Sequence, residues 1–345
     1  MSDTVTNTDP TVEEPLDPVV EAYLARRREL VEQKREEERV ERAARIAALP
    51  PVEADLVPTT ANQSLLSVFK PQRRYLLKLF VQRELAVRYQ QSFLGLIWSY
   101  INPLTQFFIY WVVMGMVMGA DRRIENYPIH VFSAFVMVHF FTETFHAGTA
   151  SIVRNKQLVE KMPLPKEMFP VAAMLVSLYH VLPQLIILLI ADVLMGWRPD
   201  VGTVYGFLLG IGIVMVLGTA LAMLFSVANV YWRDFNSFVS ILLNFVRFGC
   251  TMIFSYSQLV HVLTKHGLGG FARFYMMNPV GQAVLQFQRA FWVFSTDHPH
   301  KMMHQEFPHH LAAEGLIALG CSLVVLVIAQ LVFNRFSNRI PEQIG

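Results

Sequence analysis

The sequence of 345 residues is too apolar for one soluble domain, because 53% of its residues are hydrophobic and only 16% are charged, against about 25% in soluble proteins. Its formal net charge of +2 says little by itself, and the positions of the charges matter more. The two cysteines, Cys250 and Cys321, lie in apolar runs without metal or redox spacing, so we expect small buried hydrophobic side chains there and no metal site.

The first 65 residues are polar and are predicted to form a cytoplasmic tail. Within them, residues 19–48 predict a charged helix that is either solvated or a docking arm for a cytosolic partner. No secretory signal peptide is expected, because no apolar stretch follows a basic start. The first apolar run would then act as its own insertion signal.

Residues 66–92 mix apolar and basic side chains immediately before the first apolar run. We predict an interfacial helix here, held partly by attraction to anionic lipid. Its basic residues are Lys70, Arg73, Arg74, Lys78, Arg83 and Arg88.

Six apolar runs follow, each long enough to cross about 30 Å of hydrocarbon as a helix. The predicted fold class is therefore an all-α membrane protein with about six transmembrane helices in residues 93–340. Two glycine pairs, Gly115/Gly119 and Gly206/Gly210, have a spacing that permits close helix contact. The spans are predicted near residues 94–118, 129–151, 168–195, 203–230, 238–259 and 313–334.

Lys and Arg are concentrated before span one, between spans two and three, and after span six. This bias predicts that both termini are cytoplasmic. Residues 260–312 would then be external, and they are too polar for a span yet too apolar for a free loop. We expect short re-entrant or interfacial helices there, broken at Asn278-Pro279. The histidines of this segment are read as a partly protonated surface loop, with a metal site as the alternative; they are His298, His300, His304, His309 and His310.

Two charged residues lie inside predicted spans, where ionisable groups are costly and usually paired. Glu143 and Arg247 are each roughly 12–14 Å from the cytoplasmic ends of their spans, at 1.5 Å per residue. We predict that they pair or jointly face an aqueous cavity. The alternative is that each has a separate polar partner.

Aromatic side chains recur at helical spacing in the first two spans, where they could stack on sugars in a glycan channel. Ordinary packing and an interfacial aromatic belt are the alternatives. The candidates are Phe107, Tyr110, Trp111, Phe141 and Phe145.

Catalytic motifs are sparse. No lysine in the sequence is followed by Ser or Thr, so a phosphate-binding loop of the Walker A type is excluded. No motif of a zinc protease, a serine hydrolase or a metal-dependent sugar-nucleotide enzyme is present. We therefore expect no enzyme activity in this chain.

Residues 83–119 resemble the start of the permease subunits of type-2 ABC exporters for polysaccharide. In that family a basic interfacial helix leads into a tryptophan and an Asn/Gln-Pro pair of the first span. Residues 154–172, 231–235 and 278–279 resemble further family segments, and the match covers residues 66–340. The positions of the first motif are Arg83, Glu84, Val87, Arg88, Tyr89, Ser92, Leu94, Gly95, Trp98, Asn102 and Pro103.

The resemblance implies a homodimer in a bacterial plasma membrane, joined to two copies of a separate Walker A-bearing ATPase. That ATPase would bind ATP and Mg²⁺, while this chain binds no cofactor. The resemblance also implies export of a polyprenyl-linked glycan and contact with membrane lipid, and we expect no nucleic-acid partner. Residues 154–167 would form a coupling helix, with Arg154, Lys156, Lys161 and Lys166 facing the ATPase. The helix at residues 73–92 would form a lateral gate, and its pyrophosphate-binding candidates are Arg73, Arg74, Arg83 and Arg88.

Three alternatives stay open at this point. A type-2 ABC permease for a drug or a lipid would have the same span pattern. A membrane-embedded glycosyltransferase or acyltransferase would need clustered Asp, Glu or His at one membrane face. An ion-driven secondary transporter would need several intramembrane carboxylates, and Glu143 is the clearest, with Asp192 near a span end.

Overall fold

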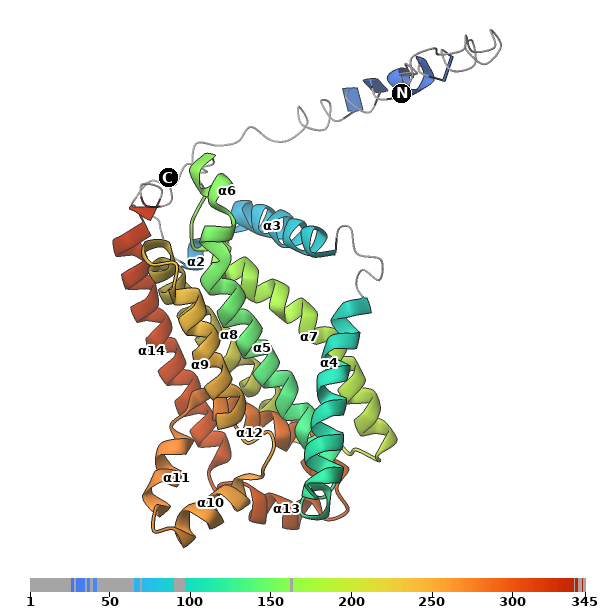
Figure 1. Ribbon diagram of the computed structural model, residues 1–345, viewed down its shortest axis with the longest axis vertical. Helices are drawn as coiled ribbons and strands as arrows, with labels where there is room; N and C mark the ends of the chain where they lie inside the picture. Colours follow the sequence, from blue (N-terminus) through green and yellow to red (C-terminus); the bar gives the residue numbers. More distant parts are fainter. Residues whose placement is uncertain are drawn as a thin grey trace, which may run out of the picture. The chain divides into compact units, whose positions relative to one another are not determined.

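The computed structural model describes most of the chain after residue 64, together with part of the charged tail (Figure 1). The described residues are 26–27, 29–34, 36–37, 40–41, 65–68, 70–89, 97–161, 164–337, 339–340 and 343. The chain divides into two units, Met1–Leu56 and Val57–Gly345. In the first unit the described residues are helical and exposed, and the rest of the predicted helix over residues 19–48 lies outside the described part.

The second unit is built from helices, and no strand occurs among its described residues, which confirms the all-α prediction. Its long helices are α3 (Pro71–Tyr89), α5 (Tyr127–Arg154), α7 (Met168–Leu194), α8 (Val201–Tyr231), α9 (Phe235–Gly249) and α14 (Leu311–Ser337). Helix α4 (Trp98–Ile109) continues into a π-helical stretch, η4 (Tyr110–Val117). The short helices are α2 (Leu65–Val68), η5 (Ala120–Arg122), α6 (Lys156–Lys161), α10 (Tyr256–Lys265), α11 (Gly269–Met276), α12 (Pro279–Phe291), η6 (Val293–Ser295) and α13 (Pro299–Glu306).

Four stretches of the described chain are long and apolar enough to cross a membrane: Tyr100–Val117, α7, α8 and α14. Helix α5 has 28 residues and coincides with the second predicted span. The predicted span over residues 238–259 is wrong in its second half, because α9 ends at Gly249. With 15 residues, α9 is only about 22 Å long.

The break after α9 is a backbone feature that hydropathy does not detect. Cys250 is extended, with φ −93° and ψ 157°, and the carbonyl of Thr251 next to it accepts a hydrogen bond from the buried Gln288 Nε2 at 2.7 Å, which ties this segment to α12. Ser255 then caps a new helix, since its hydroxyl accepts from the Gln258 N–H at 3.4 Å. An apolar run therefore contains a helix end and a new helix start.

Helix α8 is central and packs against α5, α7, α12 and α14. Gly206 and Gly210 permit the close approach of α12, because a Cβ at Gly206 would lie 2.6 Å from the Gln286 carbonyl oxygen. The contact predicted from this glycine pair is confirmed. In the other pair, Gly115 faces the Tyr127 ring, while Gly119 has a φ of +72° and lies in open space.

The predicted external segment folds into α10, α11, α12, η6 and α13, as short helices rather than a span. Helix α12 begins where Asn278-Pro279 predicted a break, with Asn278 as the N-cap and Pro279 at the first helical position. Every residue from Val280 to Phe291 is buried. Figure 1 shows α10, α11 and α13 at the end of the bundle opposite α3 and α6.

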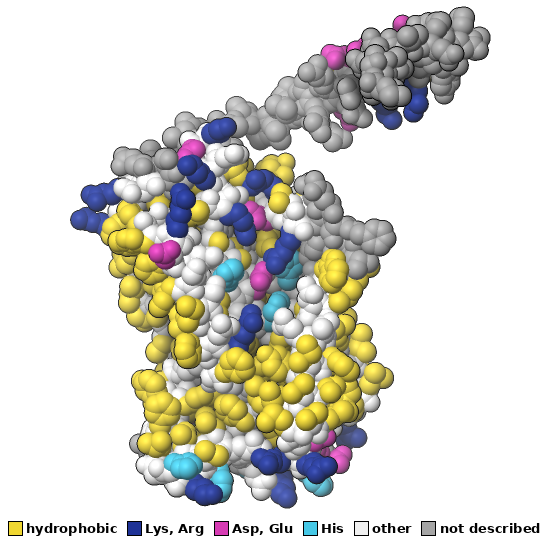
Figure 2. All heavy atoms as spheres, in the orientation of Figure 1, with side chains coloured by type: hydrophobic (Ala, Val, Ile, Leu, Met, Phe, Trp, Pro, Cys, Tyr) yellow, Lys and Arg dark blue, Asp and Glu magenta, His cyan; other side chains and the backbone are white. Residues whose placement is uncertain are grey.

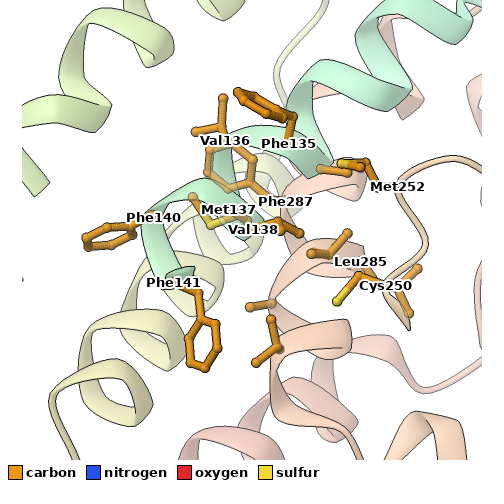
Figure 3. Packing of buried hydrophobic residues seen from close by; sticks show 14 of the residues in the cluster. Phe135, Val136, Met137, Val138, Phe140, Phe141, Cys250, Met252, Leu285 and Phe287 are labelled. Atoms are coloured by element: carbon orange, nitrogen blue, oxygen red, sulfur yellow. The ribbon is translucent and has the colours of Figure 1, made fainter. Parts of the chain in front are cut away.

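The larger of two apolar clusters surrounds α5 and α12, and Figure 3 shows its packing. Cys250 lies in it, as expected, whereas Cys321 is exposed on α14 and corrects the prediction for that residue. The second cluster joins α2 and α3 to α7, α8 and α14. Within it, the rings of Phe80 and Phe169 meet edge to face with centroids 4.9 Å apart. This contact fixes α3 across the end of the bundle (Figure 1).

Candidate functional site

The basic helix α3 is amphipathic in the folded chain. Leu77 and Phe80 are buried, while Arg74 and Lys78 on the same helix are exposed. Arg73 is buried, so it does not face the lipid surface that was predicted for it. The predicted interfacial segment is thus a helix with one face bound to the bundle and an exposed face on which basic side chains alternate with Tyr75, Leu79 and Val87.

The last turn of α3 places Arg88 against two other helices. Its Nη1 donates to Glu143 Oε1 on α5 at 2.7 Å and lies 3.2 Å from His180 Nδ1 on α7. The Arg88 side chain is 48% exposed and the Glu143 side chain 21%, so the pair stands at a partly open position. An ion pair that water reaches on one side can exchange partners more easily than a fully buried one.

A cavity of about 240 Å³ opens on the other side of Glu143, between α5 and α9. Its lining is mostly polar and comprises His139, Thr142, Glu143, His146, Ser240, Leu243, Asn244 and Arg247. Figure 2 shows charged and histidine side chains on this face, extending from the end with α3 into an otherwise hydrophobic surface. A polar cavity in such a surface offers hydrogen bonds to a ligand that cannot cross lipid alone.

The sequence predicted that Glu143 and Arg247 either pair or share a cavity; the direct pair requires correction, because the ion-pair partner of Glu143 is Arg88, whereas the two residues do line one cavity. Arg247 lines the cavity that Glu143 also faces. Among the described residues, no carboxylate lies within ion-pair distance of Arg247. Sequence reasoning placed Glu143 and Arg247 near each other but missed Arg88, since α3 reaches them only through the tertiary fold.

A second polar cluster joins α3 to the end of α5. Arg154 Nη2 lies 2.8 Å from Glu84 Oε2, and Asn155 Nδ2 donates to Glu84 Oε1 at 3.0 Å. Arg83 Nη1 donates to Asn155 Oδ1, also at 3.0 Å. Arg83 is therefore held by a neighbouring helix, and Arg154 binds α3 in this structure where contact with an ATPase was predicted.

The predicted coupling segment, residues 154–167, forms the short helix α6, and its residues 162–163 lie outside the described part. Lys156 lies 3.7 Å from Glu160 on α6, and Lys161 is exposed. Lys166 points elsewhere, because its Nζ donates to the carbonyl oxygen of Ser337 at the end of α14. Burial lowers the pKa of Lys166, the effect expected of a half-buried ammonium group.

The aromatic candidates fall into two groups. Phe141 and Phe145 are 2% and 1% exposed and belong to the core, so the prediction that they contact a glycan is not retained. Phe107, Tyr110 and Trp111 are half-buried and pack against α5. The Phe107 and Phe132 ring centroids are 4.7 Å apart, and those of Tyr110 and Phe135 are 6.3 Å apart.

Comparison with known proteins decides the class of this membrane protein. The profile of the ABC-2 type transporter family matches residues 75–280, more than half of the chain. The match extends from α3 into α12 and includes both polar clusters described above.

This chain belongs to the ABC-2 type transporter family. It is 24% identical over 269 residues to the O-antigen export system permease protein RfbA of Klebsiella pneumoniae, covering 77% of this chain and 94% of that protein. It is 26% identical over 275 residues to the protein of that name from Myxococcus xanthus, covering 79% and 96%. The resemblance stated from the sequence motifs is confirmed at the level of a transporter permease.

Several residues of this ABC-2 permease's site were not singled out by sequence reasoning. His139 and His146 flank the predicted Glu143 on α5 at helical spacing, which marks a polar stripe on an otherwise apolar helix. His180 and Gln184 make a similar pair on α7, and Gln184 Nε2 lies 3.1 Å from His139 Nδ1. Polar residues at i, i+3 and i+4 within apolar runs were the available signal.

Proposed function

We propose that this chain is the transmembrane subunit of an ATP-driven exporter that moves a polyprenyl-pyrophosphate-linked polysaccharide to the outer side of a bacterial plasma membrane. It would act as a homodimer with two copies of a Walker A-bearing ATPase. ATP and Mg²⁺ would be bound by that ATPase, because this sequence has no Walker A motif.

One observation carries the proposal. The exposed basic face of α3 lies across one end of the bundle and terminates in Arg88, beside a polar cavity in an apolar surface. A lipid with an anionic headgroup needs a basic surface at headgroup level and a polar route next to it. The names of the relatives, O-antigen export permeases, support a glycan as the rest of the substrate.

The proposed topology places both termini in the cytoplasm. Figure 1 shows α3, α6 and the last turn of α14 at one end of the second unit. The Lys and Arg residues of the short connections gather in the same segments, as the positive-inside rule expects for a cytoplasmic face. Helices α10, α11 and α13 would then lie outside.

At the gate, the substrate would compete with Glu143 for Arg88. A pyrophosphate oxygen can accept charge-assisted hydrogen bonds from the guanidinium that now binds the carboxylate. Arg247 faces the same cavity as Glu143 and would attract the second phosphate from the α9 side. Once displaced, Glu143 would remain within a cavity that offers other polar partners.

ATP-driven movement would reach the gate through α6. Lys156 and Lys161 on α6 provide the basic surface for the ATPase, and α6 begins directly after Asn155. Because Asn155 and Arg154 bind Glu84 on α3, a displacement of α6 would move the gate helix with it.

The test begins with extraction of the chain from native membranes in mild detergent and identification of the ATPase that co-purifies. The complex is then reconstituted in vesicles, and its ATPase rate is measured with polyprenyl-pyrophosphate glycan, with polyprenyl phosphate and with the free glycan. We expect stimulation by the complete lipid-linked glycan above that by either part. Arg88→Gln should raise the half-stimulating concentration about tenfold, the worth of one charge-assisted hydrogen bond.

Two further variants make the test sharp. Glu143→Gln removes the competitor for Arg88 and should lower the half-stimulating concentration. Lys78→Gln removes an exposed charge from the same helix and should leave it near the wild-type value. Equal stimulation by unrelated lipids or drugs would indicate that the exported substrate is a lipid or a drug and not a glycan. A homodimer without an ATPase, from membranes whose other ATPases survive extraction, would overturn the ATP-driven function.

A further inference from the structure

A second cavity lies at the end of the bundle opposite α3, far from the proposed gate. It measures about 470 Å³, and its lining residues come from α10, α11 and the first three turns of α14. Its α14 wall is formed at helical spacing by Glu314, Ile317, Ala318 and Cys321. Its other described residues are Tyr256, Val260, Ala272, Met276 and Met277, so Glu314 is the only charged side chain among the described residues of the lining.

The Glu314 carboxylate has a neutral partner in this structure. Its Oε2 accepts a hydrogen bond from Gln282 Nε2 at 3.2 Å. Across the described part of the chain, none of the recorded ion pairs includes Glu314. Burial and the Glu314 charge both raise the pKa of the Tyr256 hydroxyl, which can donate a hydrogen bond but has no positive charge to offset a carboxylate. A partly buried carboxylate among apolar walls favours a cationic hydrogen-bond donor.

The position of the cavity along α14 matches the level of lipid headgroups. Helix α14 has 27 residues and is about 40 Å long, which covers the hydrocarbon and both interfaces. Glu314 is in its first turn. Beyond the cavity, the exposed surface of α14 is apolar at Leu323, Val324 and Val327, where an acyl chain can lie.

We propose that this cavity binds a phospholipid whose headgroup carries a primary amine, of the phosphatidylethanolamine type. The ammonium group donates to Glu314, and an acyl chain packs against Ile317, Met276 and Val260. The bound lipid would fill the space between α14 and the short helices α10 and α11. The proposal does not depend on which substrate the permease exports.

The experiment compares three lipids in nanodiscs that contain the permease with its ATPase: phosphatidylcholine alone, and phosphatidylcholine mixed with phosphatidylethanolamine or with phosphatidylglycerol. Phosphatidylcholine is the matched probe, because its methylated ammonium has a positive charge but no N–H donor. Native mass spectrometry then counts the lipids that each complex retains. We expect preferential retention of phosphatidylethanolamine, reduced about tenfold by Glu314→Gln.

A matched control is Asp121→Asn, which makes the same chemical change at an exposed position of η5 and should retain the lipid preference. Val260→Phe is a second variant that narrows the cavity while keeping Glu314, and it should reduce retention of phosphatidylethanolamine as well. Unfolding temperatures of all variants identify a general loss of fold.

Cys321 supplies an independent readout in the native chain. It is exposed at the cavity, whereas Cys250 is buried, so the maleimide mass added to this chain in the folded complex reports on Cys321. Phosphatidylethanolamine should slow this labelling in the wild type and not in Glu314→Gln. Equal retention and equal labelling with all three lipids would overturn the proposal. If Cys321 is protected from maleimide by raising the protein concentration and not by adding lipid, a second copy of the chain covers the cavity. This result would also overturn the proposal.

Discussion

The guanidinium of Arg154, at the end of α5, lies 2.8 Å from the carboxylate of Glu84 on α3. Asn155 and Arg83 complete a cluster that holds the two helices together. Because the Arg154 side chain is 49% exposed, this ion pair contributes roughly 1 kcal/mol or less to folding stability. Its position suggests a role in transmitting movement, which the first prediction tests.

Breaking this link should impair transport more than stability. We expect Glu84→Gln and Arg154→Gln to slow transport several-fold while the unfolding temperature and the co-purification of the ATPase change little. Lys78→Gln is the control, since it removes an exposed charge from the same helix as Glu84. If Arg154→Gln releases the ATPase and Glu84→Gln does not, Arg154 contacts the partner directly, as the sequence predicted.

The partner of Glu143 can be measured with double-mutant cycles. We expect Glu143 to couple with Arg88 by about 1 kcal/mol in the free energy of unfolding, because their atoms are 2.7 Å apart. Coupling with Arg247 should be smaller than about 0.5 kcal/mol. A larger coupling with Arg247 would restore the pair predicted from the sequence.

The long helices of the bundle could be predicted from hydropathy alone. The spans predicted at residues 168–195, 203–230 and 313–334 agree within three residues with Met168–Leu194, Val201–Tyr231 and Leu311–Ser337. A lipid-facing helix has to be long and apolar, so composition determines its position. The end of α9 was not predictable in this way, because the apolar run continues past Gly249 while the backbone becomes extended at Cys250.

The candidate site was predictable only in part, because charge-bearing positions are visible in the sequence and their partners are not. Glu143 and Arg247 stood out as charges within apolar runs. Arg88 was found as one of several basic residues, but its contact with Glu143 spans 55 positions and exists only because α3 folds back across the bundle. Lys166 likewise looked like an ATPase contact, and its actual partner is the last turn of α14.

The ion pair of the buried Arg289 and the exposed Asp200 should respond asymmetrically to mutation. Arg289 donates to both Asp200 oxygens at 3.0 and 2.7 Å, and the side chains are 8% and 39% exposed. Asp200→Asn keeps the helix cap with Thr203 but leaves the arginine charge buried, at a cost of about 3 kcal/mol. Arg289→Met leaves a partly hydrated aspartate and should cost about 1 kcal/mol. Unfolding in detergent measures both, and equal costs would contradict this account.

The same pair predicts a pH dependence of stability. Burial opposes ionisation of Asp200, but hydrogen bonds from Arg289 and Thr203 outweigh it and lower the pKa of Asp200 from 3.8 to about 2. A lowered carboxyl pKa gives stability that is present above pH 3.8 and lost as the pH falls toward about 2. In the Arg289→Met variant, the unfolding temperature should therefore fall less steeply as the pH is lowered between those two values. If the unfolding temperature of the variant falls with pH as steeply as that of the wild type, the ion pair is not the cause of the acid destabilisation.

The contact between α8 and α12 should tolerate no side chain at Gly206. A Cβ there would lie 2.6 Å from the Gln286 carbonyl oxygen, a backbone atom that cannot move without shifting α12. We expect Gly206→Ala to cost about 2 kcal/mol through overpacking. The control is Gly212→Ala on the same helix, where the nearest neighbour, Leu319 Cδ1, is 3.8 Å away and the alanine should stabilise by up to about 1 kcal/mol. Because helix propensity favours alanine equally at both positions, the difference between the two variants measures the packing of α12 against α8. Equal unfolding temperatures would mean that α12 does not press on α8 at this glycine.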